Sequence, residues 1–455
     1  MKTIITGKDT VCKIMGKQTI KNTQYRMMNY VLKADCEDGS LLLNVITGQM
    51  VLLTPSEMEI VTSLPSNFSE TMEDLIKDYY LVPLRFDEKR QVQMLRKLID
   101  RLFAPKGING YTILTTTNCN ARCFYCYQAG YSHINLDKST ASNLIDFMVD
   151  HKGDTPLKLH WFGGEPLIGI ERIDQICEGL QSKGIDYISL MISNGYLFNE
   201  EIVERARNSW KLTSVQITID GTEDVYNRTK AYVKPNGSPY KRVLNNIQLL
   251  INTGIRVLIR INLDMHNITD LRALIDELYN RFKNQKLIEI YVHVLFNNEG
   301  QTPVKRTPEI TSTLFERMTE LNMYLQKLGL SNIQDELPSL KIHSCMADRS
   351  GTAVVYPNGY LYKCEHILHD DEFGYFGHID KGIINTSVIQ RFQEIYELDA
   401  CKTCELYPSC VILKECNGVE DYNDYTCLYR HDSYRNTMIT KYHNSIHNST
   451  INNLL

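Results

Sequence analysis

Three cysteines that share one short loop constrain this chain more than any other feature of its sequence. Cys119, Cys123 and Cys126 lie in "NCNARCFYCYQAG", separated by three and then two residues, directly after the β-rich run "GYTILTTT". One loop can therefore bring three soft thiolates to a single inorganic centre, with one metal position left open. The centre is either a zinc ion that recruits a fourth ligand such as His133, or a four-iron, four-sulfur (4Fe-4S) cluster with one exposed iron.

The remaining composition fits a metal-binding protein of a reducing compartment. The N-terminus "MKTIITGKDTVCKIMGKQ" lacks the apolar segment of a signal peptide, and no apolar run is long enough to span a membrane. We therefore expect a cytoplasmic protein whose 13 cysteines are reduced, so that their spacing indicates metal ligation or catalysis before disulfides. A net charge of -5 gives no sign of a general nucleic-acid-binding protein, and no membrane partner is expected. Cys12, Cys36 and Cys177 stand alone, which favours small core or surface thiols.

Seven further cysteines are concentrated in the last quarter of the chain. This region is rich in Cys, Gly and Asp and has few long periodic segments, so its fold should depend on bound metal more than on apolar burial. Cys401, Cys404 and Cys410 run C-x2-C-x5-C, a pattern that on its own also fits a zinc ribbon. The full set is Cys345, Cys364, Cys401, Cys404, Cys410, Cys416 and Cys427.

Residues 107–310 alternate strands with helices. Strand-like runs such as "LKLHWFGGEPL", "YISLMISNG" and "SVQITIDG" are separated by helical stretches such as "KSTASNLIDFMVDHK". About six such units predict an α/β fold with a parallel sheet, a partial (β/α)6 TIM-like barrel that falls short of a closed eight-stranded one. Functional groups should gather at the C-terminal ends of the strands, where the cysteine loop, "GGEP", "SNG" and "IDG" all lie.

Residues 1–90 predict a small winged-helix-like module. Residues 28–54 read as three short strands, and the two helices that follow begin at Thr54, with Glu57 completing a capping box, and at Ser69. A charged helix over 91–106 then bridges to the barrel. An exposed strand edge in such a module can pair with an extended peptide, whereas the alternative is a packing or dimerisation domain.

The cysteine loop, with the aromatic Tyr125 before its third cysteine and "GGEP" at the next strand end, resembles the radical S-adenosylmethionine (SAM) superfamily. The resemblance implies that Cys119, Cys123 and Cys126 hold a catalytic 4Fe-4S cluster whose open iron chelates the amino and carboxylate groups of SAM. An electron from the cluster then cleaves the sulfonium, and the resulting 5'-deoxyadenosyl radical abstracts hydrogen from the substrate. An external electron donor such as flavodoxin or ferredoxin is implied as a partner.

The resemblance also assigns a SAM pocket residue by residue. Because glycine allows close backbone contact and a carboxylate accepts from an ammonium, the "GGEP" segment would approach the methionine amine. The "SNG" segment would meet the ribose, "TIDG" occupies the next strand end, and Arg228 or Arg260 would pair with the SAM carboxylate. The implied pocket residues are Tyr125, Gly163, Gly164, Glu165, Ser193, Asn194, Thr218, Asp220 and Arg228.

Residues 311–455 resemble the SPASM extension of radical SAM peptide-modifying enzymes, which holds two auxiliary 4Fe-4S clusters. The resemblance assigns Cys345, Cys364 and Cys416 to auxiliary cluster I, and Cys401, Cys404, Cys410 and Cys427 to auxiliary cluster II. Five residues separate Cys410 from Cys416, where the family more often has three, and cluster I lacks a fourth thiolate. Either His343 or Asp348 fills that position, or an open iron is left that could bind a substrate cysteine.

Together these features predict a radical SAM/SPASM maturase of a ribosomally made precursor peptide, whose leader the N-terminal module would capture. We expect a thioether between a cysteine sulfur and a carbon of another residue, with SAM and three 4Fe-4S clusters as cofactors. Carbon-carbon crosslinking, epimerisation and sulfatase maturation are alternatives within the family, and a non-catalytic metal-binding adaptor is the alternative outside it. Tyr127, Asp264 and His293 are strand-end candidates for substrate contact.

Overall fold

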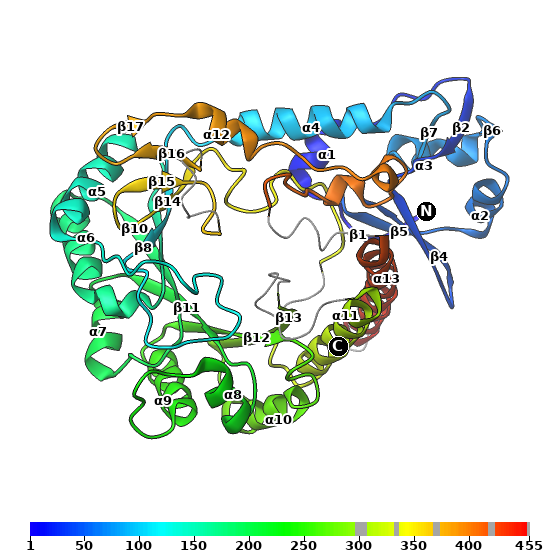
Figure 1. Cartoon of the computed structure of the whole chain (residues 1–455). Helices are drawn as coiled ribbons and strands as arrows, with labels where there is room; N and C mark the ends of the chain where they lie inside the picture. The colour runs from blue at the N-terminus through cyan, green and yellow to red at the C-terminus, as the bar shows by residue number, and fades with distance from the viewer. Residues whose placement is uncertain (296–306, 332–335, 367–373, 417–423, 453–455) are drawn as a thin grey trace. The chain divides into compact units, whose positions relative to one another are not determined.

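The structure, a computed structural model, describes residues 1–295, 307–331, 336–366, 374–416 and 424–452 (Figure 1). Its contacts divide the chain into two compact units. Unit 1 comprises Met1–Ala104, Asp335–Ser344 and Ile395–Leu455, and unit 2 comprises Pro105–Gln334 and Cys345–Glu394. Both units are therefore built from segments that are distant in the sequence.

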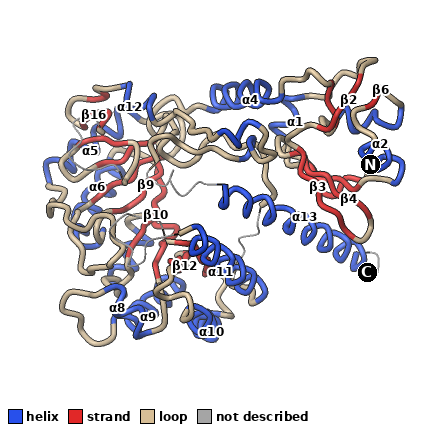
Figure 2. The backbone as a smooth tube through the Cα atoms, turned by 45° about the vertical axis from the view of Figure 1, so that its right-hand side comes forward, coloured by secondary structure: helices blue, strands red, loops and turns tan. Residues whose placement is uncertain are grey.

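Unit 2 is built on six parallel strands that alternate with helices, as the sequence predicts. The strands are β8 (Gly110–Leu114), β9 (Leu157–Phe162), β10 (Tyr187–Ser193), β11 (Leu212–Thr218), β12 (Arg256–Leu263) and β13 (Ile288–Val294). The connecting helices are α5 (Lys138–His151), α6 (Ile170–Ser182), α7 (Glu200–Asn208), α8 (Glu223–Lys230), α9 (Pro239–Asn252) and α10 (Leu271–Phe282). These helices lie on the outer side of the strands (Figures 1 and 2), so the α/β class is confirmed.

The parallel order places the ends of neighbouring strands at one edge of the sheet. In register, Met191 of β10 lies opposite Trp161 of β9, and Ile259 of β12 lies opposite Ile217 of β11. All four side chains are buried, so apolar contacts align the strands with one another. The loops that follow β8, β9, β10 and β11 consequently emerge side by side, which is what brings the predicted motifs together.

The sheet of unit 2 is larger than the six predicted strands, and it is mixed. Strand β14 (Thr352–Val355) pairs in parallel with β8, and the antiparallel strands β15 (Tyr360–Tyr362), β16 (Tyr375–His378) and β17 (Gly382–Ile383) extend the sheet to ten strands. A turn at Gly359, with φ of +89°, joins β14 to β15. Strand β14 covers the edge of β8, which would otherwise expose unpaired N–H and C=O groups. The contacts thus group 345–394 with the six parallel strands, whereas the sequence predicts a domain boundary at 310.

Unit 1 contains the three predicted strands and the helices that follow them. Strands β3 (Val31–Cys36), β4 (Gly39–Asn44) and β5 (Gln49–Leu52) pair antiparallel, and β1 (Lys2–Ile5) adds to β5. A second small sheet is formed by β2 (Gln24–Met27), β6 (Ser66–Asn67) and β7 (Leu81–Pro83). The helices are α1 (Asp9–Met15), α2 (Pro55–Thr62), α3 (Glu73–Lys77) and α4 (Glu88–Phe103). The capping box between Thr54 and Glu57 is present at the start of α2, whereas the winged-helix assignment stays a prediction.

The N-terminal segment and the C-terminal segment of unit 1 share one apolar core. One cluster of buried side chains includes Leu32 of β3, Val92 of α4, Tyr407, and also Met438, which belongs to α13 (Asp424–Asn452). Helix α13 also contacts β3 directly, since Arg435 Nε donates to the Lys33 carbonyl at 3.3 Å. The predicted modules 1–90 and 91–106 therefore pack with residues 395–455 in one unit. Although α13 is long, none of the described helices is apolar enough along its length to cross a membrane.

Candidate active site

The glycines of "GGEP" pack against the backbone of the cysteine loop. Gly164 N donates to the Thr116 carbonyl at 2.9 Å, and Glu165 N donates to the Asn118 carbonyl at 2.8 Å. A Cβ atom at Gly163 would lie 2.2 Å from the Thr116 oxygen, and one at Gly164 would lie 2.1 Å from the Asn118 oxygen. Both positions must be glycine because two backbones touch there, and Gly163 also has φ of +133°.

The carboxylate of Glu165 ties the end of β9 to the end of β10. Glu165 is fully buried, and it accepts from Ser193 Oγ at 2.9 Å, from Asn194 N at 2.8 Å and from Leu167 N at 3.3 Å. Burial raises its pKa to about 7, against the lowering effect of these three hydrogen bonds. The contact of Glu165 with a SAM ammonium stays a prediction, and the contacts that the structure shows for its carboxylate hold the two strand ends together.

Asn194 of the "SNG" segment lies next to the first cysteine of the loop. Its Nδ2 donates to Asn120 Oδ1 at 2.6 Å and lies 3.9 Å from Cys119 Sγ, and Ala121 N lies 3.4 Å from the same sulfur. Burial, together with the nearby Glu165 and the two other cysteines of the loop, raises the pKa of Cys119 to about 12. The three sulfurs are therefore close enough to repel one another as thiolates, an arrangement that a bound iron centre would relieve.

A buried lysine that no sequence motif marked lies beside the loop. Lys230 Nζ lies 2.9 Å from Asp220 Oδ2 and donates to Tyr125 Oη and to Thr218 Oγ1, each at 2.6 Å. Tyr125 in turn donates to Asp220. Although burial opposes it, the ion pair with Asp220 raises the pKa of Lys230. Three predicted site residues thus meet on one ammonium group.

The backbone of Lys230 holds the cysteine loop as well. Its carbonyl accepts from Arg122 N at 2.8 Å and lies 4.0 Å from Cys123 Sγ. A further backbone hydrogen bond joins the segment after α8 to the cysteine loop. In it, Val233 N donates to the Asn120 carbonyl at 2.8 Å. The signal that could have found Lys230 is its place at the end of α8, a helix that begins directly after "IDG".

The structure also places four other side chains that the sequence singled out. Arg228 is exposed on α8, and Arg260 Nε donates to Asn262 Oδ1 at 2.8 Å. His133, the fourth ligand of the zinc alternative, is exposed. Asp264 is buried, and its Oδ2 has no hydrogen-bond partner among the residues that the structure describes.

Two substrate-contact candidates can also be placed. The rings of Tyr127 and His366 lie 4.2 Å apart between centroids, and His293 Nδ1 lies 2.7 Å from the carbonyl of Val294. The roles predicted for both candidates stay predictions.

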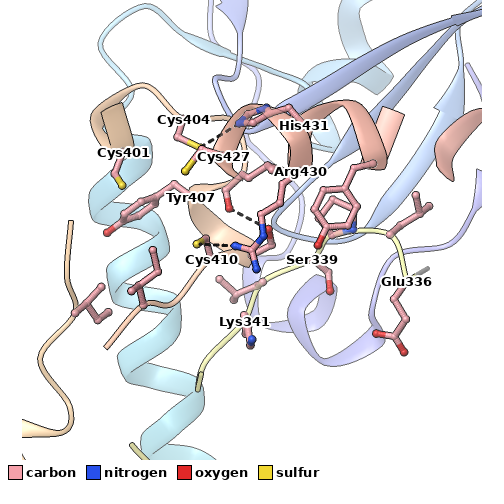
Figure 3. A pocket seen from close by; sticks show the side chains of 18 of the residues that line it. Glu336, Ser339, Lys341, Cys401, Cys404, Tyr407, Cys410, Cys427, Arg430 and His431 are labelled. Atoms are coloured by element: carbon pink, nitrogen blue, oxygen red, sulfur yellow. Dashed lines mark hydrogen bonds between the residues drawn. The ribbon is translucent and has the colours of Figure 1, made fainter. Parts of the chain in front are cut away.

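The four cysteines predicted for auxiliary cluster II line one cavity of unit 1 (Figure 3). The cavity has a volume of about 320 Å³, and its wall includes the short helix Asp399–Lys402, the loop after it and α13. Burial raises the pKa of the Cys427 thiol, and its neighbours in the cavity raise it further. The cysteines are Cys401, Cys404, Cys410 and Cys427.

Two basic side chains lie next to two of these four sulfurs. His431 Nε2 lies 3.4 Å from Cys404 Sγ, and hydrogen bonding to Cys404 and Glu405 raises the pKa of His431 to about 9. Arg430 Nη1 lies 3.7 Å from Cys410 Sγ. Four soft thiolates among positive charges suit an anionic iron–sulfur cluster, so the residues fit that group.

The described residues form no site for a single metal ion. Among the described residues, no group of three His, Cys, Asp or Glu side chains is arranged to hold one metal ion. A 4Fe-4S cluster spaces its cysteines more widely than one ion does, because each thiolate binds a different iron.

The residues predicted for auxiliary cluster I are divided between the units. Cys345 and Cys364 belong to unit 2, whereas Cys416 belongs to unit 1. Burial and Tyr356 raise the pKa of Tyr131, with further contributions from Cys126 and Cys364, so these two sulfurs lie near one ring.

The two candidates for the fourth ligand of cluster I also have contacts. His343 Nε2 lies 3.1 Å from Asp100 Oδ1, and Asp348 accepts from Cys345 N at 3.3 Å. The ligand set of cluster I stays a prediction.

Comparison with known proteins identifies the family of the parallel strands and helices in unit 2. The sequence model of the radical SAM superfamily matches residues 113–278. Residues 113–278 are a radical SAM domain. The match covers β8 to α10 with the cysteine loop, and the predicted recognition is confirmed.

Curated proteins similar to this chain include an uncharacterized protein and a sulfatase-maturating enzyme. An uncharacterized protein of Methanocaldococcus jannaschii is 33% identical over 26% of this chain, and the match spans 40% of that protein. The cysteine-type anaerobic sulfatase-maturating enzyme of Clostridium novyi is 23% identical over 65% of this chain and 84% of that enzyme. Only part of the first of these relatives is therefore covered.

Solved structures show the same fold around the radical SAM domain. Native anSMEcpe with bound AdoMet matches with a TM-score of 0.57 and 15% identity, over 74% of this chain and 99% of that one. Streptococcus suis SuiB bound to S-adenosylmethionine matches with a TM-score of 0.53 and 15% identity, over 88% of this chain and 97% of that one. At such identities the likeness concerns the fold alone.

Proposed function

We propose that this radical SAM protein modifies a ribosomally made precursor peptide and forms a thioether from a cysteine sulfur to a carbon of another residue. The observation that carries the proposal is the three-cysteine loop, locked by backbone contacts to the "GGEP" segment and reached by Asn194. A second set of cysteines, around one cavity, lies in the same unit as the N-terminal strands. This combination joins a radical source with a redox centre and a module able to bind a peptide.

The residues of the loop define its proposed role. Cys119, Cys123 and Cys126 would hold a 4Fe-4S cluster through three irons, and with SAM this cluster supplies a 5'-deoxyadenosyl radical. The chain's own task is to hold these sulfurs in place, which the contacts of Gly164 and Lys230 with the loop backbone do.

The outer edge of β1 is the proposed place for the precursor peptide. Strand β1 lies at the end of its sheet, whereas Arg435 of α13 donates to a β3 carbonyl at the opposite end. An edge strand offers N–H and C=O groups to an extended peptide, and neighbouring side chains add specificity. SuiB has been solved bound to its precursor peptide SuiA, and its match to this chain includes 88% of the residues.

The thioether follows from the predicted shortage of cluster I ligands. An iron without a protein thiolate would bind the cysteine of the peptide. In the net reaction the peptide loses two hydrogens, one as an atom to the 5'-deoxyadenosyl group and one as the thiol proton. The electron left over when the carbon–sulfur bond forms would pass to an iron–sulfur acceptor, which balances the electron used to cleave SAM.

The first experiment separates an enzyme from a metal-binding adaptor. Protein reconstituted anaerobically should contain iron and sulfide and should release 5'-deoxyadenosine from SAM under dithionite. The Cys123→Ala variant should release none, while Cys36→Ala, a half-buried cysteine outside both groups, should behave as the wild type. A colourless protein that carries only zinc would exclude the proposal.

The second experiment identifies the modification. A short precursor peptide encoded near the gene, co-expressed with the protein, should lose two hydrogens by mass spectrometry and keep no free thiol at the modified cysteine. Sulfatase maturation is the second candidate, favoured by the match to the Clostridium novyi enzyme. Oxidation of the cysteine in a sulfatase-derived peptide, with no reaction of the precursor, would select that candidate.

A further inference from the structure

Helix α13 brings two nitrogen-bearing side chains to sulfurs of the four-cysteine cavity (Figure 3). Arg430 Nη1 lies 3.7 Å from Cys410 Sγ, and His431 Nε2 lies 3.4 Å from Cys404 Sγ. Cys427 lies about one turn earlier on the same helix. One helix therefore supplies one sulfur of the cavity and polar contacts to two of the others.

Among the described residues, two carboxylates near these cysteines are paired with cations other than Arg430. Glu405 accepts from Arg435 Nη2 at 2.7 Å and lies 3.3 Å from the Nδ1 atom of His431. Glu397 accepts from Lys89 Nζ at 2.6 Å. Their negative charges are therefore partly compensated.

A second buried cation reaches the same cysteine from α4. Arg96 is 6% exposed, and it donates to the carbonyls of Tyr407 at 2.8 Å, of Pro408 at 3.0 Å and of Cys410 at 3.1 Å. Among the described residues, its hydrogen-bond partners are backbone carbonyls and include no carboxylate. The surroundings of Cys410 consequently carry two guanidinium groups, of which Arg430 contacts the sulfur itself.

We propose that Arg430 raises the reduction potential of the iron–sulfur cluster held by the four cysteines of this cavity, with His431 as a weaker contributor. The inference rests on the proposed function, which assigns a cluster to these cysteines. Reduction adds one electron to a cluster that already carries the charge of four thiolates. A fixed positive charge and an N–H group directed at a thiolate stabilise the reduced form more than the oxidised form.

The test measures midpoint potentials in the full-length protein. Replacing Cys119, Cys123 and Cys126 by Ala removes the catalytic cluster, so the remaining signals belong to auxiliary clusters. In an electron paramagnetic resonance redox titration, the signal of interest is the one that Cys404→Ala abolishes. Arg430→Met should make its midpoint potential more negative, by about 59 mV for each tenfold change in the one-electron equilibrium.

Two further variants keep the charge or the hydrogen bond in part. Arg430→Lys retains a positive charge and Arg430→Gln retains an N–H donor, so each should shift the potential less than Arg430→Met does. They also decide the question if Arg430→Met does not assemble its clusters.

The matched control removes an equal charge close to the cysteines in sequence. Lys402 lies between Cys401 and Cys404, but its side chain is 71% exposed and pairs with Asp399 at 2.9 Å. Lys402→Met should leave the potential unchanged because solvent screens that charge.

The outcomes separate this inference from the proposed function. An unchanged potential in all three Arg430 variants, or an equal shift in Lys402→Met, would overturn the role of Arg430 and leave the function standing. Absence of the Cys404-dependent signal and of the corresponding iron and sulfide would overturn both.

Discussion

The three-cysteine loop of unit 2 and the four-cysteine cavity of unit 1 surround their sulfurs with different charges. At the loop, Cys119 Sγ faces the neutral Ala121 N and Asn194 Nδ2, while the nearby Glu165 adds to the rise in the Cys119 pKa. At the cavity, Arg430 and His431 face the sulfurs directly. Thiolates in neutral or negative surroundings hold a cluster that is difficult to reduce, and cations make reduction easier.

The buried cation beside the loop does not remove this difference. Lys230 lies close to Cys123, but its ammonium group is paired with Asp220 and shared with Tyr125 and Thr218. Its charge is therefore compensated locally. Cysteine spacing alone predicts a cluster at both sites. Under the proposed function, the neighbouring charges would make the loop cluster the electron source and the cavity cluster an electron acceptor.

The largest expected effect comes from removing one cysteine at each site. Cys123→Ala should abolish 5'-deoxyadenosine release and lower the iron content by about four per chain. Cys404→Ala should lose a similar amount of iron and stop peptide modification, but it should still cleave SAM. The measurements are iron analysis, chromatography of the nucleoside and mass spectrometry of the peptide. Equal loss of SAM cleavage in both variants would contradict the division of roles.

A single methyl group at the loop should have the next largest effect. In Gly164→Ala the added Cβ would lie 2.1 Å from the Asn118 oxygen, a backbone atom that cannot rotate away. We expect the iron bound by the loop and SAM cleavage to fall towards the level of Cys123→Ala.

Gly130→Ala is the matched control for this methyl group. Gly130 lies at the end of the same loop with φ of +87°, but nothing lies within 4 Å of an added Cβ. It should cost about 1 kcal/mol in unfolding free energy and retain SAM cleavage. Normal iron content in Gly164→Ala would show that the close backbone contact is dispensable.

Removing the compensated cation should have a moderate effect on stability. Lys230→Met would leave Asp220, whose side chain is 1% exposed, without its ion-pair partner. We expect a loss of about 3 kcal/mol in unfolding free energy, measured by denaturant titration of the cluster-free protein. The double variant Lys230→Met/Asp220→Asn should recover part of the loss, because the uncompensated charge is gone. No recovery would assign the effect to packing.

Much of the fold was predictable because local patterns decide it. Strand β10 alternates buried and more exposed residues, β13 is buried along most of its length, and the capping box of Thr54 and Glu57 needs four consecutive residues. Strands β14 to β17 were missed because they have only two to four residues each, and because β14, which joins them to the sheet, pairs with β8, far away in the sequence. The shared core of unit 1 was missed for the same reason.

The candidate site divides in the same way. Motif spacing predicted the cysteine loop and the four cysteines that line one cavity, since ligands of one cluster come from short sequence patterns. Lys230 could not be predicted, because its importance arises from contacts with Asp220 and Thr218 that only the fold creates. The predicted approach of the glycine pair to the methionine amine stays a prediction, and the contacts that the structure shows for these glycines are to the cysteine loop itself.

The smallest expected effect is a pH dependence confined to the loop. Burial raises the pKa of Glu165 from 4.5 to about 7, so the folded protein holds a proton there at pH values where the unfolded chain has released it. Raising the pH from about 4.5 to about 7 therefore removes stability from the folded state. The unfolding free energy of the wild type should fall relative to that of Glu165→Gln across this window. The cavity of unit 1 does not contribute to this pH dependence, so the unfolding free energy of Arg430→Gln should change with pH as that of the wild type does. Equal pH profiles for the wild type and Glu165→Gln would show that the pKa of the Glu165 carboxyl group is not perturbed.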